Sequence, residues 1–169
     1  YGQRKIGELC GCSKQLVETI RKKYGIDAVT KEDRINYKLN NSFDDLQRNL
    51  IYGSLLGDGC IRLADNGRTA RYKEMHSLKQ KCYIEWKRNI LKDYVNKPVS
   101  VGLKRWRDGR KIEELRFSTC YHKNFVEFYN MFYDEQGKKH LPNNFEETLN
   151  PFILAVCFMD DGSYHGNEY

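Results

Sequence analysis

Residues 50–59 read LIYGSLLGDG, and residues 151–162 read PFILAVCFMDDG. Both stretches are apolar over about two helical turns and end in an acidic residue followed by glycine. We predict two matched helices, each ended by a glycine in the left-handed conformation. Each helix would then deliver a carboxylate at its foot, Asp58 in one and Asp161 in the other.

The two predicted helices are able to pack closely, because small residues recur along them: Gly53, Ser54, Gly57, Ala155 and Cys157. Close packing would bring the two carboxylates together. Neighbouring carboxylates repel each other, and one or more hard cations such as Mg²⁺ or Mn²⁺ would relieve that repulsion. The alternative is a pair of buried helices that end in ordinary Asp-Gly turns and bind no metal.

Three short segments accompany the predicted helices: GDGCIR at 57–62, GKKHLPNN at 137–144 and FMDDG at 158–162. Together with the helices they resemble the LAGLIDADG homing endonucleases, in particular the monomeric, two-motif, intron-encoded type. The resemblance covers residues 53–162, about two-thirds of the chain. It implies an enzyme that cleaves both strands of duplex DNA at a specific site with the help of a divalent metal ion.

The resemblance also implies a metal site at the two motifs. Asp58 and Asp161 match the family's catalytic, metal-binding acids, and Gly57 and Asp160 lie beside them in the implied site. One residue departs from the family's pattern, because Cys157 stands where the second motif often has a large aromatic residue.

Two further parts of the active site follow from the same resemblance. Lys139 in the GKKxxP pattern matches the basic active-site residue, with Lys138 as its near alternative. Taken alone, a Lys-Lys pair in a loop is more typical of a solvated turn. His76 and Ser77 lie where family members place a polar residue that orders metal or water.

The composition favours a polyanionic partner and excludes a membrane-spanning chain. The 169 residues include 29 basic and 23 acidic side chains, which gives a formal charge of +6. No apolar run approaches the roughly 18 residues that a transmembrane helix needs, and no signal peptide opens the chain. The six cysteines lack zinc-ligand spacing, so we expect reduced thiols in a soluble, intracellular protein.

Residues 4–26 carry a separate helical pattern. Apolar residues at helical spacing predict two short helices, with Gly11 in the turn between them and Ser13 capping the second. The pattern resembles the helix-turn-helix of recombinases and many regulators, in which the second helix enters the major groove. In that placement the second helix contacts base edges through Lys14, Gln15 and Glu18, and phosphates through Arg21, Lys22 and Lys23. The alternative is a helical hairpin that only packs on the rest of the chain.

Helices and hairpins alternate between the two motifs. After the first motif helix we predict strands at 60–64 and 69–79, a helix at 81–95, a second hairpin turning at 108–109, and a helix at 121–133. Apolar and polar residues alternate along the second hairpin, so one sheet face is apolar and the other polar and basic. The fold class is therefore α+β, an αββαββα unit whose antiparallel, saddle-shaped sheet is backed by helices.

Basic residues gather in the two hairpins. They are Arg62, Arg68, Arg71, Lys73, Lys104, Arg105, Arg107, Arg110, Lys111 and Arg116, with Tyr72 and Trp106 among them. A concave ribbon of this kind fits the major groove of duplex DNA. The alternative is a solvated face with salt bridges to Glu113 and Glu114.

We divide the chain into a small all-α helix-turn-helix at 1–27, a linker at 28–44, a first LAGLIDADG repeat at 45–150 and the start of a second repeat at 151–169. The second repeat is expected to be incomplete, because its strands would follow Gly162. The full-length chain would then form a pseudo-dimer of two repeats.

The function predicted from these features is site-specific, metal-dependent hydrolysis of phosphodiesters in double-stranded DNA. Two other classes stay open. A transcription regulator that only binds DNA through a LAGLIDADG core would have lost the metal acids, and both acids are present here. An RNA maturase keeps the same motifs, so intron RNA is a further candidate partner.

Overall fold

The computed structural model describes residues 3–26, 42–105 and 108–162, and the chain divides into two compact units, Tyr1–Arg34 and Ile35–Tyr169. The predicted linker lies mostly outside the described residues, as do Trp106 and Arg107. None of the described helices is long and apolar enough to cross a membrane. The six cysteines all lie within the described residues, and none of them forms a disulfide.

Within its described residues, 3–26, the first unit contains two helices, α1 (Gln3–Cys10) and α2 (Lys14–Lys23). Gly11 joins them with a φ of 64°, and the Ser13 hydroxyl accepts a hydrogen bond from the backbone N–H of Leu16 at 3.2 Å. The predicted turn and helix cap are therefore confirmed, because a left-handed residue is most easily a glycine and a serine satisfies an N–H at the helix start.

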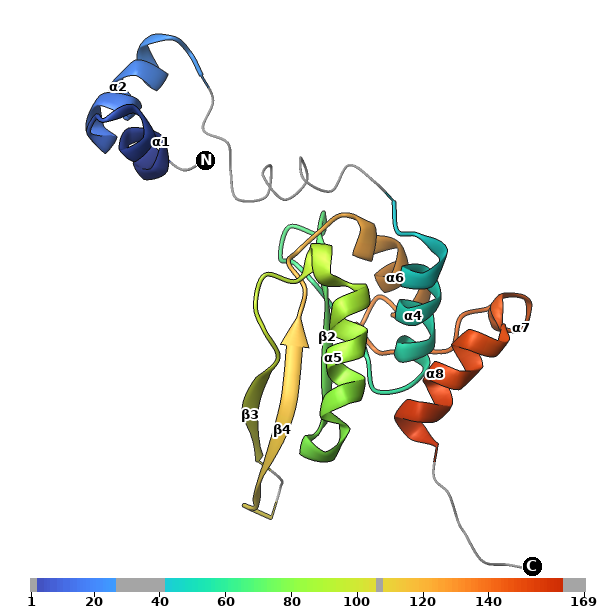
Figure 1. Ribbon diagram of the computed structural model, residues 1–169. Helices are drawn as coiled ribbons and strands as arrows, with labels where there is room; N and C mark the ends of the chain where they lie inside the picture. Colours follow the sequence, from blue (N-terminus) through green and yellow to red (C-terminus); the bar gives the residue numbers. More distant parts are fainter. Residues whose placement is uncertain (1–2, 27–41, 106–107, 163–169) are drawn as a thin grey trace, which may run out of the picture. The chain divides into compact units, whose positions relative to one another are not determined.

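The second unit follows the predicted order of helices and hairpins (Figure 1). Its elements are α4 (Asp45–Leu56), β1 (Cys60–Leu63), β2 (Ala70–Ser77), η1 (Leu78–Gln80), α5 (Lys81–Ile90), η2 (Lys92–Tyr94), β3 (Ser100–Arg105), β4 (Lys111–Ser118), α6 (Asn124–Phe132), α7 (Phe145–Thr148) and α8 (Pro151–Asp161). This arrangement confirms an α+β fold with the αββαββα order. The short helix α7 was not predicted.

Two elements end earlier than predicted. The helix predicted at 81–95 ends at Ile90 and continues as the 3₁₀ turn η2, and the strand predicted at 69–79 ends at Ser77. The first difference has a packing cause. Tyr94 and Val95 are buried, and the Tyr94 ring lies 4.8 Å from that of Phe43, so the chain leaves the helix to reach the core.

The four strands form one antiparallel sheet in the order β1-β2-β4-β3. Burial alternates along β2, where Ala70, Tyr72, Glu74 and His76 are buried and the residues between them are more exposed. Helices α5 and α6 lie against the sheet, and aromatic residues of α6 join the core with Leu50, Ile51 and Leu55 of α4. The face that carries His76 is thus the covered face.

The opposite face of the sheet, which we call the open face, carries basic side chains. The strand pairing places on it Arg62, Arg71, Lys73, Met75, Lys104 and Arg116. A hollow of about 250 Å³ on this face is lined by Lys73, Met75, Ser100 and Arg116, among others. The predicted alternation of an apolar and a basic face is therefore confirmed.

Candidate active site

Helices α4 and α8, which carry the two motifs, pack against each other and have well-defined starts. Asp44 and Gln47 form a capping box at the start of α4. Asn150 caps α8 by accepting the backbone N–H of Ile153 at 2.9 Å, and it also donates to the Asn49 side chain of α4 at 3.2 Å. The beginnings of the two helices are thereby tied together.

Glycines make the close contact between these helices possible. A Cβ at Gly53 would lie 2.8 Å from the Ile153 carbonyl oxygen, and a Cβ at Gly57 would lie 2.5 Å from the Cβ of Asp160. The predicted left-handed conformation was wrong, since neither Gly59 nor Gly162, the glycines that follow the two acids, has a positive φ. These glycines are required by the closeness of neighbouring atoms and not by a positive φ.

Three carboxylates meet where the two helices end. The side chain of Asp58 is 43% exposed, whereas that of Asp160 is fully buried and Asp161 is an exposed residue. Burial raises the pKa of the Asp58 carboxyl; the neighbouring His76 opposes this rise, and the negative charges of Asp160 and Asp161 add to it. Asp161 is therefore close enough to Asp58 for its charge to act on the Asp58 carboxyl.

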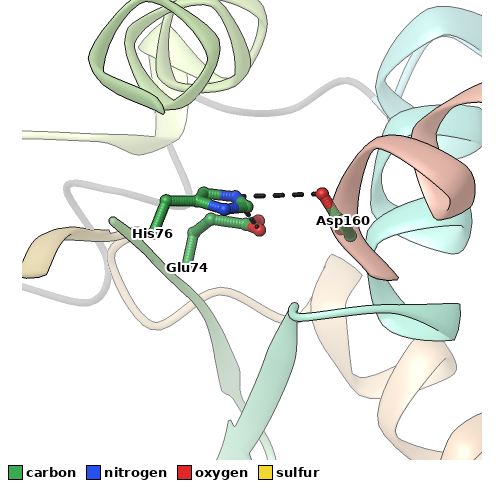
Figure 2. A group of neighbouring side chains, drawn as sticks. All are labelled: Glu74, His76 and Asp160. Atoms are coloured by element: carbon green, nitrogen blue, oxygen red, sulfur yellow. Dashed lines mark hydrogen bonds and ion pairs between the residues drawn. The ribbon is translucent and has the colours of Figure 1, made fainter. Parts of the chain in front are cut away.

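His76 connects Asp58 to the interior of the protein. Its Nδ1 lies 3.6 Å from Oδ2 of Asp58, and its Nε2 lies 2.9 Å from Oε1 of Glu74, the neighbour on the same face of β2. Figure 2 shows that the His76 ring and the Glu74 carboxylate point together toward Asp160 of α8, with a distance of 3.8 Å between Nε2 and the Asp160 carboxylate. Within the described residues, Nδ1 of His76 and Oε2 of Glu74 are buried without a hydrogen-bond partner.

A buried lysine completes this group. The Lys87 ammonium of α5 donates to Oε1 of Glu74 at 2.9 Å and to both oxygens of Asp160 at 2.6 and 2.9 Å. The Tyr83 hydroxyl, one helical turn earlier, donates to Asp160 at 2.8 Å. Burial, followed by the charge of Asp160, strongly raises the pKa of Tyr83, so this hydroxyl stays protonated and remains a donor.

Lys139 approaches the same place from the loop after α6. Its ammonium donates to the carbonyl oxygens of Gly57 at 2.8 Å and Gly59 at 3.0 Å, on either side of Asp58. The residue as a whole is exposed, but the ammonium group is partly enclosed, and this burial lowers the pKa of Lys139 against the opposing influence of Cys60, Asp161 and Asp58. Among the two candidate lysines, Lys139 is thus the one at the carboxylates.

The other predicted site residues lie in several places. Ser77 is exposed on the open face, where its hydroxyl bonds Gln80 at 3.1 Å, away from the carboxylates. Arg105 follows Lys104 in β3 and lies opposite Lys111 in the strand pairing. Its side chain is therefore on the covered side of the sheet and not on the open face. In α2, Lys14 and Gln15 are exposed, and Glu18 is paired with Lys22 at 3.3 Å.

The sequence interpretation missed the buried polar group formed by Glu74, Tyr83 and Lys87 with Asp160. Glu74 carried a usable signal, since it shares the strand parity of the buried Tyr72, and an acid on an apolar face calls for a partner. Lys87 carried a comparable signal, since it lies four residues after Tyr83 and three before Ile90 and so shares the predicted apolar side of its helix.

The residues at the helix ends fit a divalent cation. Carboxylate oxygens are the ligands that Mg²⁺ and Mn²⁺ prefer, and the raised pKa of Asp58 together with the unpartnered Nδ1 of His76 marks a place where a positive charge would be stabilised. Glu74, His76 and Asp160 also bring their ligand atoms within 4.8 Å of one another. The Lys87 ammonium, however, already binds two of these three residues.

The sequence model of the LAGLIDADG DNA endonuclease family matches residues 48–168. The chain belongs to this family. DNA endonuclease I-ChuI of Chlamydomonas applanata is 30% identical over 130 residues, which are 72% of this chain and 60% of that protein. The cytochrome b mRNA maturase bI2 of Debaryomyces hansenii is 30% identical over 141 residues, 82% of this chain and 53% of that protein.

Two further comparisons define how much of a LAGLIDADG protein is present. Protein RecA of Mycobacterium gastri is 31% identical over 134 residues, 78% of this chain but 30% of that protein. The structure of the homing endonuclease I-WcaI bound to its DNA recognition sequence superimposes with a TM-score of 0.68 at 23% identity, covering 83% of this chain and 62% of that one. The fold is thus that of a homing endonuclease, and the chain spans less than two-thirds of the relatives it matches.

Proposed function

We propose that this chain is part of a site-specific endonuclease that cuts both strands of duplex DNA in the presence of Mg²⁺ or Mn²⁺. The observation that supports the proposal is that Asp58 and Asp161 stand at the ends of two helices packed through glycines, where burial and the charges of Asp160 and Asp161 raise the pKa of Asp58. Family membership and the similarity to I-ChuI support it.

In this proposal Asp58 and Asp161 hold the metal ions, with one acid serving each strand. A bound ion would activate a water molecule and stabilise the attacking and leaving oxygens of the phosphodiester. Lys139 contributes a positive charge between Gly57 and Gly59, in reach of a phosphate that develops negative charge. Asp160 is occupied by Lys87 and Tyr83, so we assign the metal to its neighbour Asp161.

The open face is the proposed DNA-binding surface. Among the described residues, Arg62, Lys73 and Arg116 make no ion pair, and Glu113 and Glu114 do not pair with them, which argues against the salt-bridged alternative. Unpaired cations on a curved sheet are suited to the phosphates and base edges of a duplex. The related I-WcaI was solved bound to its DNA recognition sequence, which supports the same use here.

The exposed side of α8 supports a second half in the full-length protein. Leu154, Phe158 and Met159 are 55, 63 and 50% exposed, and neighbouring apolar side chains of this size usually have a partner. We propose that they pack against the remainder of a second LAGLIDADG repeat, which makes a pseudo-dimer. The helix-turn-helix would add a separate DNA contact. Cysteines that form no disulfide suit an intracellular setting.

The decisive experiment is cleavage by the full-length protein of a library of random duplexes, followed by sequencing of the broken ends. We expect one preferred site with Mg²⁺ or Mn²⁺ and no cleavage in excess chelator. Asp58→Asn and Asp161→Asn should each abolish double-strand cleavage, by at least a factor of about 100, and leave binding of the selected duplex largely intact. Double-strand cleavage that persists in either variant would reject the assignment of the metal acids.

One observation favours a second activity on RNA. The maturase bI2 of Debaryomyces hansenii matches a larger share of this chain than I-ChuI does, 82% against 72%. If this protein assists an intron RNA, splicing of that intron should proceed with the Asp58→Asn, Asp161→Asn double variant, because folding an RNA needs no phosphodiester cleavage by the protein. Splicing that is equally efficient without the protein would reject the maturase alternative.

A further inference from the structure

The buried polar group beneath the carboxylates forms a continuous chain between the two motifs. Asp160 of α8 binds Lys87, Lys87 binds Glu74, Glu74 contacts His76, and His76 faces Asp58. The side chains of Glu74, His76, Lys87 and Asp160 are all fully buried. Three elements, β2, α5 and α8, therefore meet through charged groups in a place where polar contacts are hard to rearrange.

The lysine at the centre takes the position that a cation would need. Its ammonium has three protons, and it makes three short hydrogen bonds, one to Glu74 and two to Asp160. A metal ion bound by Glu74, His76 and Asp160 would have to displace this ammonium and leave it buried without its partners, which is costly. The three residues are therefore better explained as a fixed ion network than as a metal site.

Helix α5 also contacts α8 at residues spread along α8. The Phe152 ring lies 6.2 Å from that of Trp86, and the Tyr83 hydroxyl is 3.3 Å from the Val156 carbonyl oxygen. Phe152, Val156 and Asp160 are four residues apart, so they lie on one side of α8. Gly57 leaves room for the Asp160 side chain to pass the end of α4 and reach the lysine. Lys87 is the deepest of these contacts and lies nearest to the carboxylates.

We propose that Lys87 is a positioning residue, which joins Asp160 to Glu74 and so fixes Asp161 relative to Asp58. This inference rests on the proposed function, in which Asp58 and Asp161 hold the metal ions. Asp160 then acts as the anchor of α8, while the next residue, Asp161, extends to the metal. The link continues through Glu74 and His76 to Asp58, so a single buried cation orients both acids.

The first test measures thermal unfolding of the full chain. Lys87→Met leaves Glu74 and Asp160 buried without their cation and should lower the unfolding midpoint by on the order of 10 °C. The double variant Lys87→Met, Asp160→Asn keeps the net charge and should recover much of this loss. The matched control is Lys81→Met, Glu85→Gln, which removes an exposed ion pair of the same helix and should change little. A midpoint for Lys87→Met that is no lower than that of the Lys81→Met, Glu85→Gln control would overturn the proposal.

The second test measures binding of Mn²⁺ alone by electron paramagnetic resonance, without DNA. Asp160→Asn should bind as many ions as the wild type, and Asp161→Asn should bind fewer. The charge-neutral double variant at 87 and 160 should keep the number of ions and bind them about tenfold more weakly, since residues behind metal ligands act on affinity at this scale. The control at 81 and 85 should bind as the wild type does.

These outcomes separate the two proposals. If Asp161→Asn loses ions while the double variant at 87 and 160 keeps wild-type affinity, only the positioning role of Lys87 is wrong. If Asp160→Asn loses an ion, Asp160 is a metal ligand and the proposal is likewise overturned. If Asp161→Asn binds as many ions as the wild type, the assignment of the metal acids is itself wrong, and the positioning role falls with it.

Discussion

Asp160 and Asp161 are neighbours in the sequence, but their surroundings differ and suit them to different roles. Asp160 is fully buried and receives hydrogen bonds from Lys87 and Tyr83, so its charge is already compensated. Asp161 is exposed and acts on Asp58 only through its charge. A metal ion gains most from carboxylates whose charge is not already compensated, which is why we propose Asp161, and not Asp160, as the ligand.

The ionised Asp58 side chain should destabilise the folded protein when no metal is bound. Asp58→Asn should therefore raise the unfolding midpoint. Its pKa is raised in the folded state, mainly by burial, so the folded protein disfavours the ionised form. The folded state then binds the proton more readily than the unfolded state, and stability falls as pH rises from the ordinary aspartate pKa through the raised one. The gain from Asp58→Asn should be small, because the side chain is 43% exposed.

The measurement is thermal unfolding of both proteins in chelator at neutral pH and at pH 3. The difference in midpoint should be present at neutral pH and shrink in acid, where Asp58 is protonated in both the folded and unfolded states. A midpoint for Asp58→Asn that lies below the wild type at neutral pH would show that His76 stabilises the carboxylate more than burial penalises it.

At the scale of elements, the contact between α4 and α8 depends on Gly53. We expect Gly53→Ala to lower the free energy of unfolding by about 1 to 3 kcal/mol, because the added methyl would lie 2.8 Å from a backbone oxygen and 2.9 Å from the Val156 Cβ. Helix propensity alone predicts the opposite sign, since alanine favours a helix over glycine by about 1 kcal/mol.

The matched control is Gly102→Ala in β3. There the added methyl would approach only the flexible end of the Arg116 side chain, at 2.6 Å. Chemical denaturation should find this variant within about 0.5 kcal/mol of the wild type, as for most substitutions outside a tight contact. Equal losses at the two glycines would mean that the close approach of α4 and α8 contributes nothing specific.

The elements of the second unit were largely predictable, whereas the connections between them were not. Periodicity gave the helices, hairpins and basic face, because each of these depends on residues close together in the sequence. The end of α5 at Ile90 depends on Tyr94 reaching Phe43, and the network around Lys87 joins residues from β2, α5 and α8. Such contacts between distant segments leave no spacing that a sequence pattern can show. The paired motifs were the exception, since their repetition predicted that Asp58 and Asp161 lie near each other.

At the scale of the whole molecule, DNA affinity should depend steeply on salt. Each phosphate neutralised contributes roughly 0.9 log units of affinity per log unit of salt, through release of counterions. Lys104→Ala should weaken binding of the selected duplex and reduce this slope by about one unit. Arg105→Ala is the matched control, because it removes the same charge from the next residue of β3, on the other face of the sheet. Equal salt slopes for the two variants, measured by fluorescence anisotropy, would show that the open face is not the DNA-binding surface.

The helix-turn-helix should act as a tethered second DNA contact. Residues 27–45 include few large apolar side chains that would weld the first unit to the second, and the two units are compact by themselves. A tethered module raises affinity through its effective concentration near the DNA, without changing the chemistry of the other module.

Deletion of residues 1–40 should therefore weaken binding of the selected duplex by about 10-fold to 100-fold and shorten the footprint, while the scissile phosphates stay the same. They stay the same because Asp58, Asp161 and the open face, which choose them, all lie in the second unit. A footprint of the same length with and without residues 1–40 would show that α2 does not touch DNA, and the two helices would then be a hairpin with a packing role only.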